Sequence, residues 1–234
     1  MPSSLPAVLP EGDDKRRTVR AMFDTIAPRY DLVNRVMTFG LDRGWRRRTV
    51  ASLTLDKRSR VLDVACGTGD LCRDLAAAGY RPLGADLSAG MLRHARTDAP
   101  LVHADALRLP FPNQSLDGAV SGFALRNVVG LPPLFAELHR VLRPGGRVAL
   151  LDVATPSHPV VRAGHAVYFG RVAPLVGAAL SDAAAYRYLP RSVAYLPPAA
   201  ELLDALRSAG FVAVERRLLS GGITQLLTAT RSAS

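Results

Sequence analysis

The chain has 234 residues, 48% of them hydrophobic, a formal net charge of +10 and two cysteines. This length and composition predict one domain with a sizeable core and exclude disordered and fibrous proteins. Cys66 and Cys72 are too few and too close in sequence for a disulfide framework, and no His or Cys pattern has metal-ligand spacing. We therefore predict a reduced, cytoplasmic protein without a metal site.

Residues 1–14 are rich in Pro, Ser and Ala and lack the basic segment and apolar run of a secretory signal. We expect them to be a disordered lead-in to a single domain over residues 15–234. No stretch reaches the roughly 18 uninterrupted apolar residues of a membrane span. The longest apolar stretch, Val160–Leu180, is interrupted by charged residues and a proline.

Residues 15–55 are expected to form N-terminal helices. The pattern predicts one over Arg16–Ile26, ended by Pro28, and one over Leu41–Leu53, with Asp42 as its N-cap and Trp45 on its apolar side.

Short apolar runs then alternate with helical patterns, which predicts a mostly parallel, doubly wound sheet. The predicted strands are Arg60–Ala65, Arg81–Ala85, Leu101–Ala104, Leu116–Gly122 and Arg147–Val153. The predicted helices between them are Asp70–Ala78, Ser88–Arg96 and Leu131–Leu142. Pro144, Gly145 and Gly146 form a tight turn into the fifth strand.

After the fifth strand this alternation ends. Residues 157–198 are interpreted as a lid or insertion, and Ala199–Ala209 as a helix stopped by Gly210. Two further strands, Phe211–Leu218 and Ile223–Thr230, form a hairpin. A Rossmann-like, mostly parallel seven-stranded sheet that ends in an antiparallel hairpin is the α/β layout of class I methyltransferases.

The glycine loop is the sharpest local motif: the first strand runs through Asp63 into Gly67-Thr68-Gly69, which opens a helix. Glycine allows the backbone to pass close to a ligand, although a simple strand-to-helix turn has the same pattern. A dinucleotide fingerprint would place Gly or Ala where this chain has Cys72.

Acidic residues follow three successive strands, and they favour S-adenosylmethionine over NAD. Asp63 can meet the ammonium of the cofactor, Asp86 both ribose hydroxyls, and Asp105 the adenine amino group, with the Ala106 N–H beside it. An acid at Asp86 alone would also suit NAD, and each Asp alone could be a helix cap. The three together are expected at one edge of the sheet, where ligands of open α/β folds bind.

The motifs resemble those of the ubiquinone/menaquinone biosynthesis C-methyltransferases from about Val19 to Thr228. The segments that carry this resemblance are Met22–Asp31 with Asn34, Trp45–Arg47, Asp63–Asp70, Ala85–Leu92, Leu109–Phe111, Phe123–Val128, Val141–Gly146, Tyr186–Leu189 with Ser192, and Ala209–Phe211. The resemblance implies methylation of a ring carbon of a prenylated quinol by S-adenosylmethionine. It places cofactor contacts at Thr68, Asp86, Asp105 and Ala106.

The chain departs from this family's pattern at a few positions, most of them on the acceptor side. Gly122 replaces a frequent serine, Ala124 a glycine and Asp152 a frequent glutamate, and Gln225–Leu227 replaces Ala-Leu-His. The exact acceptor is therefore less constrained by the resemblance than the cofactor is.

Arg126 and Asn127 follow the fourth strand and are the first catalytic candidates. A ring carbon becomes nucleophilic when its hydroxyl is deprotonated, and an arginine can hold the resulting phenolate, although it can also pair with a structural acid. His165 and Tyr168 are candidates for taking the proton or packing on the ring. Tyr30 and Tyr188 are candidates for closing over the cofactor.

The expected partners follow from charge and chemistry. Seven arginines of the first two predicted helices could rest on an anionic membrane at the inner face of the cell membrane, or simply be solvated. They are Arg16, Arg17, Arg20, Arg43, Arg46, Arg47 and Arg48.

The sequence leaves open whether the protein forms a homodimer. We expect no nucleic acid, since no binding module is appended, although a nucleic-acid-binding protein and a methyltransferase of a soluble aromatic metabolite are the alternatives. The Ala- and Arg-rich composition suggests a GC-rich bacterial source and favours menaquinone over ubiquinone.

Overall fold

The computed structural model describes residues 11–168 and 192–233. Its centre is one seven-stranded sheet in the order β3-β2-β1-β4-β5-β7-β6. The strands are β1 Arg60–Val64, β2 Arg81–Asp86, β3 Leu101–His103, β4 Leu116–Gly122, β5 Leu142–Val153, β6 Phe211–Leu219 and β7 Thr224–Arg231. Strands β1 to β5 pair in parallel, and β7 pairs antiparallel with both β5 and β6. The predicted class I methyltransferase fold is confirmed.

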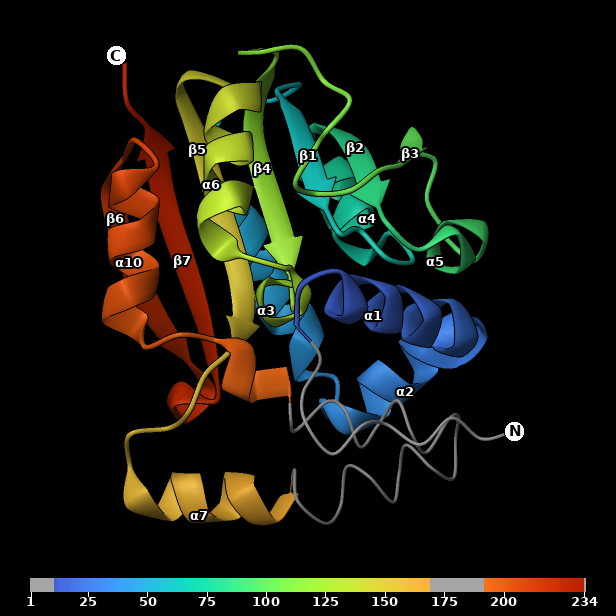
Figure 1. Ribbon diagram of the computed structural model, residues 1–234, viewed down its shortest axis with the longest axis vertical. Helices are drawn as coiled ribbons and strands as arrows, with labels where there is room; N and C mark the ends of the chain where they lie inside the picture. The colour runs from blue at the N-terminus through green and yellow to red at the C-terminus, as the bar shows by residue number, and fades with distance from the viewer. Residues whose placement is uncertain (1–10, 169–191, 234) are drawn as a thin grey trace.

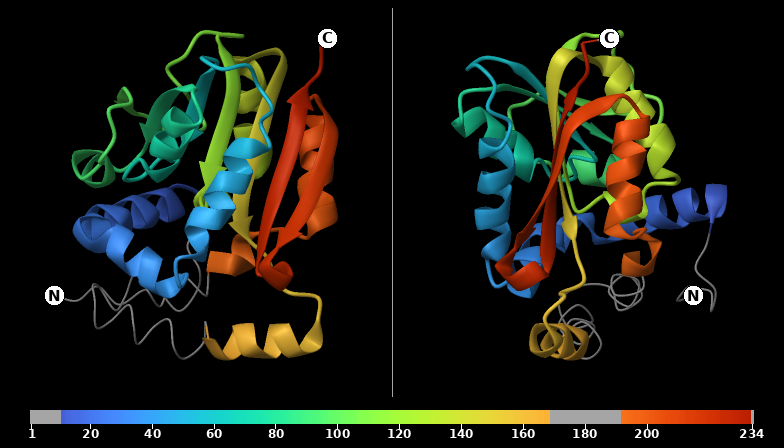
Figure 2. Two further views of the ribbon diagram at one scale, coloured as in Figure 1. Left: turned by 180° about the vertical axis from the view of Figure 1, so that it is seen from behind. Right: turned by 90° about the vertical axis from the view of Figure 1, so that its left-hand side faces the viewer.

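Helices cover both faces of the sheet (Figures 1 and 2). The helices are α1 Gly12–Ile26, α2 Tyr30–Met37, α3 Leu41–Ala51, α4 Asp70–Ala77, α5 Ala89–Arg93, α6 Leu131–Val141, α7 Pro159–Val167 and α10 Ala199–Ser208. Short 3₁₀ turns are η1 Ala27–Arg29, η2 Leu125–Asn127, η4 Val193–Tyr195 and η5 Ser220–Gly222. Helices α6 and α10 lie on one face and α3 on the other, as the edge-on view in Figure 2 shows.

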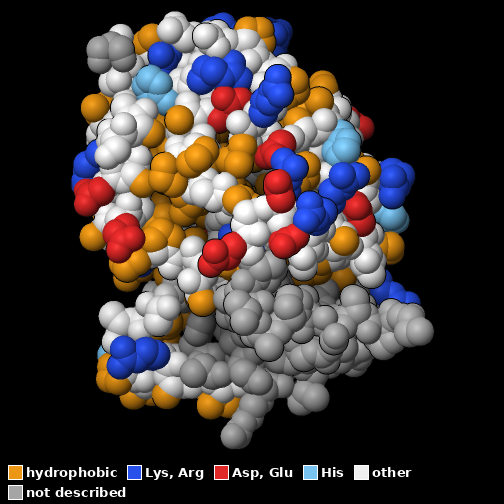
Figure 3. Space-filling view, in the orientation of Figure 1, with side chains coloured by type: hydrophobic (Ala, Val, Ile, Leu, Met, Phe, Trp, Pro, Cys, Tyr) orange, Lys and Arg blue, Asp and Glu red, His pale blue; other side chains and the backbone are white. Residues whose placement is uncertain are grey.

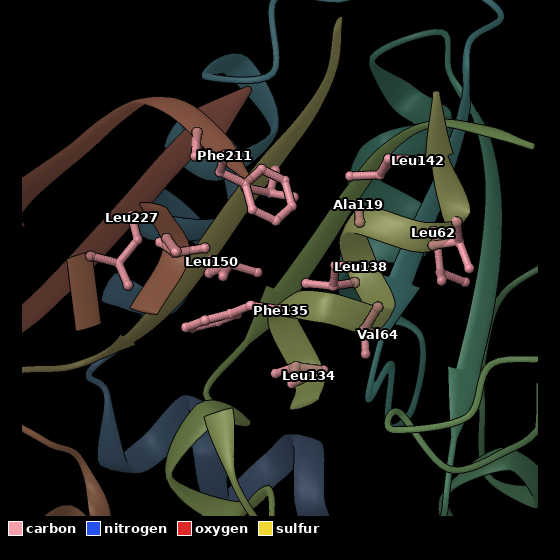
Figure 4. Packing of buried hydrophobic residues seen from close by; sticks show 14 of the residues in the cluster. Leu62, Val64, Ala119, Leu134, Phe135, Leu138, Leu142, Leu150, Phe211 and Leu227 are labelled. Atoms are coloured by element: carbon pink, nitrogen blue, oxygen red, sulfur yellow. The ribbon is translucent and has the colours of Figure 1, made fainter. Parts of the chain in front are cut away.

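Two cores form because neighbouring residues of the central strands point to opposite faces of the sheet. In β5, Val148 and Leu150 pack toward α6 and α10, whereas Ala149 and Leu151 pack toward α3 and α4. Figure 4 shows the first of these cores, with Phe135 of α6 close to Leu150. Burial on both faces explains the continuous apolar runs of these strands.

Helices α1 and α2 lie beyond the carboxyl ends of the parallel strands, where the arrowheads of β4 and β5 point toward them in Figure 1. A third cluster packs them against α5, with Ile26 and Ala27 of the first helices, Val33 and Met37 of α2, and Met91 of α5. Helices α1 and α2 therefore cover the edge of the sheet that was expected to bind ligands, and we call these two helices the roof.

Polar contacts fasten α1 at both ends. Near its start, the Lys15 ammonium donates to the carbonyl of Val128 at 2.9 Å and lies 3.7 Å from the centre of the Tyr195 ring. Toward its end, Asp24 Oδ1 accepts from Ser88 Oγ at 2.6 Å and from Gly90 N at 2.7 Å. A Cβ on Gly90 would lie 2.7 Å from the Asp24 backbone, so only glycine permits this approach.

Several boundaries differ from those expected. Helix α1 begins at Gly12, inside the predicted lead-in, and residues 1–10 lie outside the described part of the chain. Helix α5 ends at Arg93 rather than Arg96. In β5, Leu142 already pairs with Leu116, and pairing resumes at Arg147, so the predicted turn is a bulge within the strand.

The interpretation of Asp42 as the N-cap of α3 was wrong. The cap is Gly40, at a φ of 73° that favours glycine, and Asp42 is a buried residue of the first turn of the helix. Its Oδ1 accepts from Thr38 Oγ1 at 2.8 Å, and its Oδ2 pairs with Arg46. Of the predicted lid, α7 and the residues from Ser192 on are described, whereas residues 169–191 lie outside the described residues.

Lys15 gives a testable link between pH and stability. Burial lowers the pKa of Lys15 to about 8, whereas the ordinary value is 10.5. Between these two values the unfolded chain binds more protons than the folded chain, so this group makes the free energy of unfolding rise with pH. The free energy of unfolding of the parent minus that of Lys15→Met should therefore increase from pH 8 to pH 10 in urea titrations. A difference that stays flat, as expected for the exposed control Lys57→Met, would contradict the burial of Lys15.

Candidate functional site

Two adjoining cavities lie between the carboxyl edge of the sheet and the roof of α1 and α2. The smaller measures about 110 Å³ and the larger about 500 Å³. Tyr30, Gly67 and Phe123 line both, so the cavities meet at the ends of β1 and β4. Residues of the glycine loop and the ends of β2 and β3 are thereby brought together, as the motifs predicted.

The glycine loop approaches the cavities with its backbone. Gly67 has a φ of 55°, and a Cβ placed on it would meet nothing within 4 Å, so it leaves open space beside both cavities. Gly69 has a φ of 83°, and its Cβ would lie 2.7 Å from Thr97 Cγ2, so this glycine is required by packing. Glycine is therefore needed at the two positions for different reasons: Gly67 leaves space for a ligand, and Gly69 allows the loop to pack against Thr97.

Asp86, at the end of β2, lines the smaller cavity. Its Oδ2 accepts from Gly67 N and its Oδ1 from Ser88 N, each at 2.7 Å, which fixes the carboxylate against the loop. Each oxygen keeps a second lone pair, so two further hydroxyl groups can donate to it. Burial raises the pKa of Asp86, and the two backbone N–H donors oppose that shift.

Asp105 and Ala106 follow β3 and line the same smaller cavity. Asp105 Oδ1 accepts from Leu107 N at 2.9 Å, and Oδ2 pairs with Arg16 of α1 at 3.1 Å. The pattern of the sequence did not indicate this partner. Arg16 thus fixes Asp105 and helps α1 to close the cavity.

Asp63 carries a buried carboxylate without a full set of partners. Its side chain, in β1, lines the larger cavity. Oδ2 accepts from Cys72 Sγ at 3.4 Å, and Oδ1 has no partner among the described residues. Burial, followed by the neighbouring Cys72, raises the pKa of Asp63 well above its usual range. An unsatisfied buried carboxylate oxygen beside an open loop fits a ligand that brings a cationic N–H donor.

Thr68 lies between the two glycines of the loop and was predicted to contact the cofactor. Its side chain is buried, and its Oγ1 donates to Asp31 Oδ1 at 2.5 Å. Asp31 belongs to α2, so this bond ties the loop to the roof. Asp31 belongs to a segment that carries the family resemblance, but the sequence pattern indicates no role for its carboxylate.

The larger cavity is mainly apolar, with a polar wall on one side. Its apolar lining includes Met22, Ile26, Met37, Trp45, Leu71 and Ile223. On the polar side Arg46 lies among three carboxylates, paired with Asp42, with Asp70 at 3.0 Å and with Asp74 at 2.8 Å. Burial raises the pKa of Asp70, although Arg46 and Arg73 oppose this. A flat apolar ring with a polar edge matches this lining.

Arg126 lines the larger cavity from η2, and it pairs with Asp152 at the end of β5. Its Nη1 also donates to the Phe123 carbonyl at 2.8 Å, and its Nε donates to Ser192 Oγ at 3.1 Å. The structural acid that the sequence analysis left open as an alternative is therefore present. Among the described residues, none accepts from Nη2, so this nitrogen can still serve a ligand in the cavity.

The other candidate catalytic and cofactor-closing residues do not all lie in the same cavity as Arg126. Asn127 lines the smaller cavity, not the larger one with Arg126. Tyr168 lines the larger cavity and donates to the carbonyl of Met37 at 2.6 Å. Tyr30 lies where the cavities meet, and burial raises the pKa of Tyr30. The His165 side chain and Tyr188 lie outside the described part of the chain.

The expected basic face needs a correction. Arg46 points inward to its three carboxylates and is not available to a membrane. Arg16 pairs with Asp13 and Asp105, and Arg17 pairs with Asp14. Arg43, Arg47 and Arg48 are exposed, as expected. Within residues 11–168 and 192–233, none of the helices combines the length and apolarity of a membrane span.

The chain is similar to known proteins over nearly its whole length. The model of the ubiE/COQ5 methyltransferase family matches residues 11–231. The chain belongs to this family. It is 42% identical to a demethylmenaquinone methyltransferase of Roseiflexus sp. (strain RS-1), over 94% of this chain and 96% of that protein. It is 41% identical to the ubiquinone/menaquinone biosynthesis C-methyltransferase UbiE of Syntrophotalea carbinolica, over 91% and 94% respectively.

Solved structures show the same fold at lower identity. A SAM-dependent methyltransferase from Thermotoga maritima aligns with a TM-score of 0.65 at 18% identity, over 92% of this chain and all of that one. Phosphoethanolamine N-methyltransferase 2 of Haemonchus contortus, in complex with S-adenosyl-L-methionine, aligns with a TM-score of 0.60 at 15% identity, over 81% and 52%. The chain is an S-adenosylmethionine-dependent methyltransferase, and the predicted enzyme class and cofactor are confirmed.

The residues fit this cofactor. The smaller cavity offers paired oxygens at Asp86 for a ribose diol and Asp105 with Ala106 for an adenine edge. The unpartnered oxygen of Asp63 suits an ammonium group, and the open side of Gly67 leaves room for the chain between them. No group in this set requires a pyrophosphate.

Loss of the Asp86 carboxylate should weaken S-adenosylmethionine binding about tenfold or more, because hydrogen bonds to a charged group are worth roughly 1.5–3 kcal/mol. Titration calorimetry of Asp86→Ala against the parent measures this. Asp117→Ala, at the opposite edge of the sheet, is the matched control and should bind normally. Unchanged affinity in a folded Asp86→Ala protein would remove Asp86 from the site, and micromolar NAD binding by the parent would overturn the choice of cofactor.

Proposed function

We propose that the protein methylates a ring carbon of a prenylated quinol, converting demethylmenaquinol to menaquinol. The observation that carries the proposal is an apolar cavity of about 500 Å³ that opens directly onto the cofactor cavity at Gly122 and Phe123. The names of the relatives, at 41–42% identity over more than 90% of the chain, support the same acceptor class.

In this proposal S-adenosylmethionine supplies an electrophilic methyl group on a sulfonium. Asp86, Asp105 and Ala106 hold its nucleoside from the ends of β2 and β3, and Asp63, Gly67 and Thr68 hold its amino acid tail. These residues are fixed to one another and to the roof, so donor and acceptor can be aligned without rearrangement of the loop. Alignment of this kind supplies a large part of a displacement barrier, up to about 7–11 kcal/mol.

Arg126 is the residue that we propose to stabilise the quinol as it loses its proton. Asp152, the Phe123 carbonyl and Ser192 hold its guanidinium in place, while Nη2 remains for the oxygen of the ring. A fixed positive group interacts more strongly with the ring oxygen as the phenolate forms. The phenolate in turn places negative charge on the adjacent ring carbon. The pairing with Asp152 thus positions Arg126 rather than replacing its role.

Once the ring carbon has gained the methyl group, it must lose its own hydrogen as a proton to restore the aromatic ring, and the ring oxygen regains a proton. One proton is therefore released in each turnover, and it requires an acceptor within the same cavity. Tyr30 stays protonated because burial raises its pKa, so it acts as a hydrogen-bond donor to the ring oxygen. Asp70 is the described carboxylate that lines the cavity, remains partly exposed and has a raised pKa, and we propose it as the acceptor. Asn127 lies on the cofactor side and orients that ligand instead.

Arg126→Ala and Arg126→Lys should both lower turnover by about a hundredfold or more, on the scale of a lost oxyanion donor. Lysine keeps the charge but cannot bind Asp152, Ser192 and a ring oxygen through one planar group. Single-turnover rates and calorimetry measure turnover and cofactor affinity separately. S-adenosylmethionine should bind almost unchanged; a variant that loses cofactor affinity in step with turnover, or that works normally, contradicts this role.

The acceptor itself is tested with methyl-labelled S-adenosylmethionine, demethylmenaquinol and a soluble catechol run side by side. We expect label on a ring carbon of the quinol, identified by NMR of the product, and little transfer to the catechol. Label on oxygen, or a preference for the catechol, would support a methyltransferase of a soluble aromatic metabolite instead.

A further inference from the structure

Helix α2 is apolar on two sides, although only one of them packs against the protein. Val33 and Met37 are buried in the cluster under the roof. Leu32 and Val36, four residues apart, lie on the outer side and are 54% and 41% exposed, and Phe39, in the turn after the helix, is 76% exposed. A surface helix of a water-soluble domain normally presents polar residues there, so this outer stripe requires a partner.

Phe39 connects the outer stripe to the larger cavity. It lines that cavity and is also the most exposed of the large hydrophobic residues described. Leu41, at the start of α3, likewise lines the cavity and is 47% exposed. The acceptor cavity therefore reaches the surface within the apolar stripe. Phe39 has a φ of 51°, an uncommon conformation for a bulky side chain, and the backbone holds its ring outward at this mouth.

Helix α7 adds exposed apolar side chains at the lower end of the molecule, below and to the left of α2 in Figure 1. Val160 and Val167 of α7 are 73% and 55% exposed, and Figure 3 shows hydrophobic side chains along the lower edge of this helix. The ring of Tyr168, directly after α7, lies 5.6 Å from that of Phe39, and its hydroxyl donates to Met37. Tyr168 thus links the end of α7 to the end of α2 at the mouth.

Positive charge accompanies this surface. Arg35 lies within the outer stripe of α2, and Arg43 follows Leu41 by two residues; both are exposed. In the parts of the chain that are described, neither forms an ion pair, whereas Arg16 and Arg17 of α1 do. An apolar stripe with unpaired arginines at its border is the pattern of a helix that lies in a membrane interface.

We propose that this end of the molecule, formed by Leu32, Val36, Phe39, Leu41, Val160 and Val167, docks on an anionic lipid bilayer. The acceptor cavity then opens toward the bilayer, and a prenylated acceptor enters headgroup first while its tail stays in the lipid. This inference deepens the proposed function, since only an acceptor with a lipid tail needs such a mouth. It also moves the expected docking face away from Arg16, Arg17 and Arg46, which are paired, and keeps Arg43 of α3 at its border.

A bilayer fits this surface better than a second copy of the chain. A symmetric dimer through the outer stripe would bring Arg35 and Arg43 of both copies together, and like charges at an interface are costly. Anionic headgroups neutralise the same arginines, each basic residue near such a surface contributing attraction. Self-association is therefore an outcome of the test, not the expectation.

Co-sedimentation with vesicles of phosphatidylcholine alone, or with 30% phosphatidylglycerol, tests the docking face without any substrate. Phe39→Asn removes the ring and suits a left-handed backbone, so the fold should survive. Val212→Thr changes an equally prominent apolar side chain, 51% exposed on the edge strand β6, and is the matched control. We expect Phe39→Asn, and Leu32→Gln with Val36→Gln, to reduce partition into anionic vesicles about tenfold, as the loss of one or two inserted apolar side chains predicts.

Arg35→Gln with Arg43→Gln should reduce binding to anionic vesicles only, and Val212→Thr should change nothing. Equal binding by the parent and Phe39→Asn would overturn the docking face. The docking face would also be overturned if light scattering showed that the parent is a dimer, that Phe39→Asn dissociates it, and that vesicle binding persists in this variant.

Activity separates this inference from the proposed function. Leu32 and Val36 line neither cavity, so their double variant should methylate a short-tailed, dissolved quinol normally and a long-tailed quinol in vesicles slowly. A parent that binds vesicles through Phe39 but methylates no quinol would refute the acceptor and leave the docking face standing. Equal slowing on both quinols would count against the docking face.

Discussion

The buried pair of Arg126 and Asp152 is the contact around which the site is organised. Asp152 is fully buried and Arg126 nearly so. Two charges are stable in such a place only if most of their remaining polar groups are hydrogen-bonded. Among the described residues, only Nη2 of this guanidinium lacks an acceptor. Asp152 accepts from Arg126 N and Val153 N, and Arg126 donates to Phe123 and Ser192. The end of β5, the turn after β4 and the last part of the predicted lid, at Ser192, are thereby joined. Phe123, in the wall between the cavities, is held at a φ of 60°.

Charged groups of both signs line the two cavities, and in the proposed function individual groups match the charges of the ligands. Asp86 and Asp105 of the smaller cavity and Asp63 of the larger one would meet the positive cofactor. Arg126 of the larger cavity would meet the acceptor as it becomes negative. Because the wall between them is shared, one rigid element positions both partners of the reaction. The roof closes over this arrangement through Lys15, Arg16 and Asp24 of α1.

The strands and the carboxylates at their ends were predictable because both depend on local sequence. Buried parallel strands give continuous apolar runs, and a residue at a strand end must lie at the edge of the sheet, as Asp86 does. The glycine loop was predictable for the same reason. A ligand site could therefore be expected at this edge from local sequence, but not the number or the shape of its cavities.

The roof and the pairing of charges were not predictable because they depend on contacts between distant segments. Helix α2 has eight residues between Pro28 and Gly40, too few to be stable alone, and forms because Val33 and Met37 are buried by α1 and α5. Arg46 was expected among the surface arginines, and only the fold shows the three carboxylates that hold it inward. The partner of Arg126, 26 residues away at Asp152, likewise had no signal in the pattern.

The central claim is that Arg126 and Asp152 act as one unit, and a double-mutant cycle on the free energy of unfolding tests it most directly. Arg126→Met and Asp152→Asn should each destabilise the protein by about 3–5 kcal/mol, because each leaves an uncompensated buried charge or donor. The double variant removes both charges, so its loss should fall below the sum of the single losses by at least about 2 kcal/mol. Losses that add to within about 0.5 kcal/mol would show that the two side chains are independent and would contradict the account.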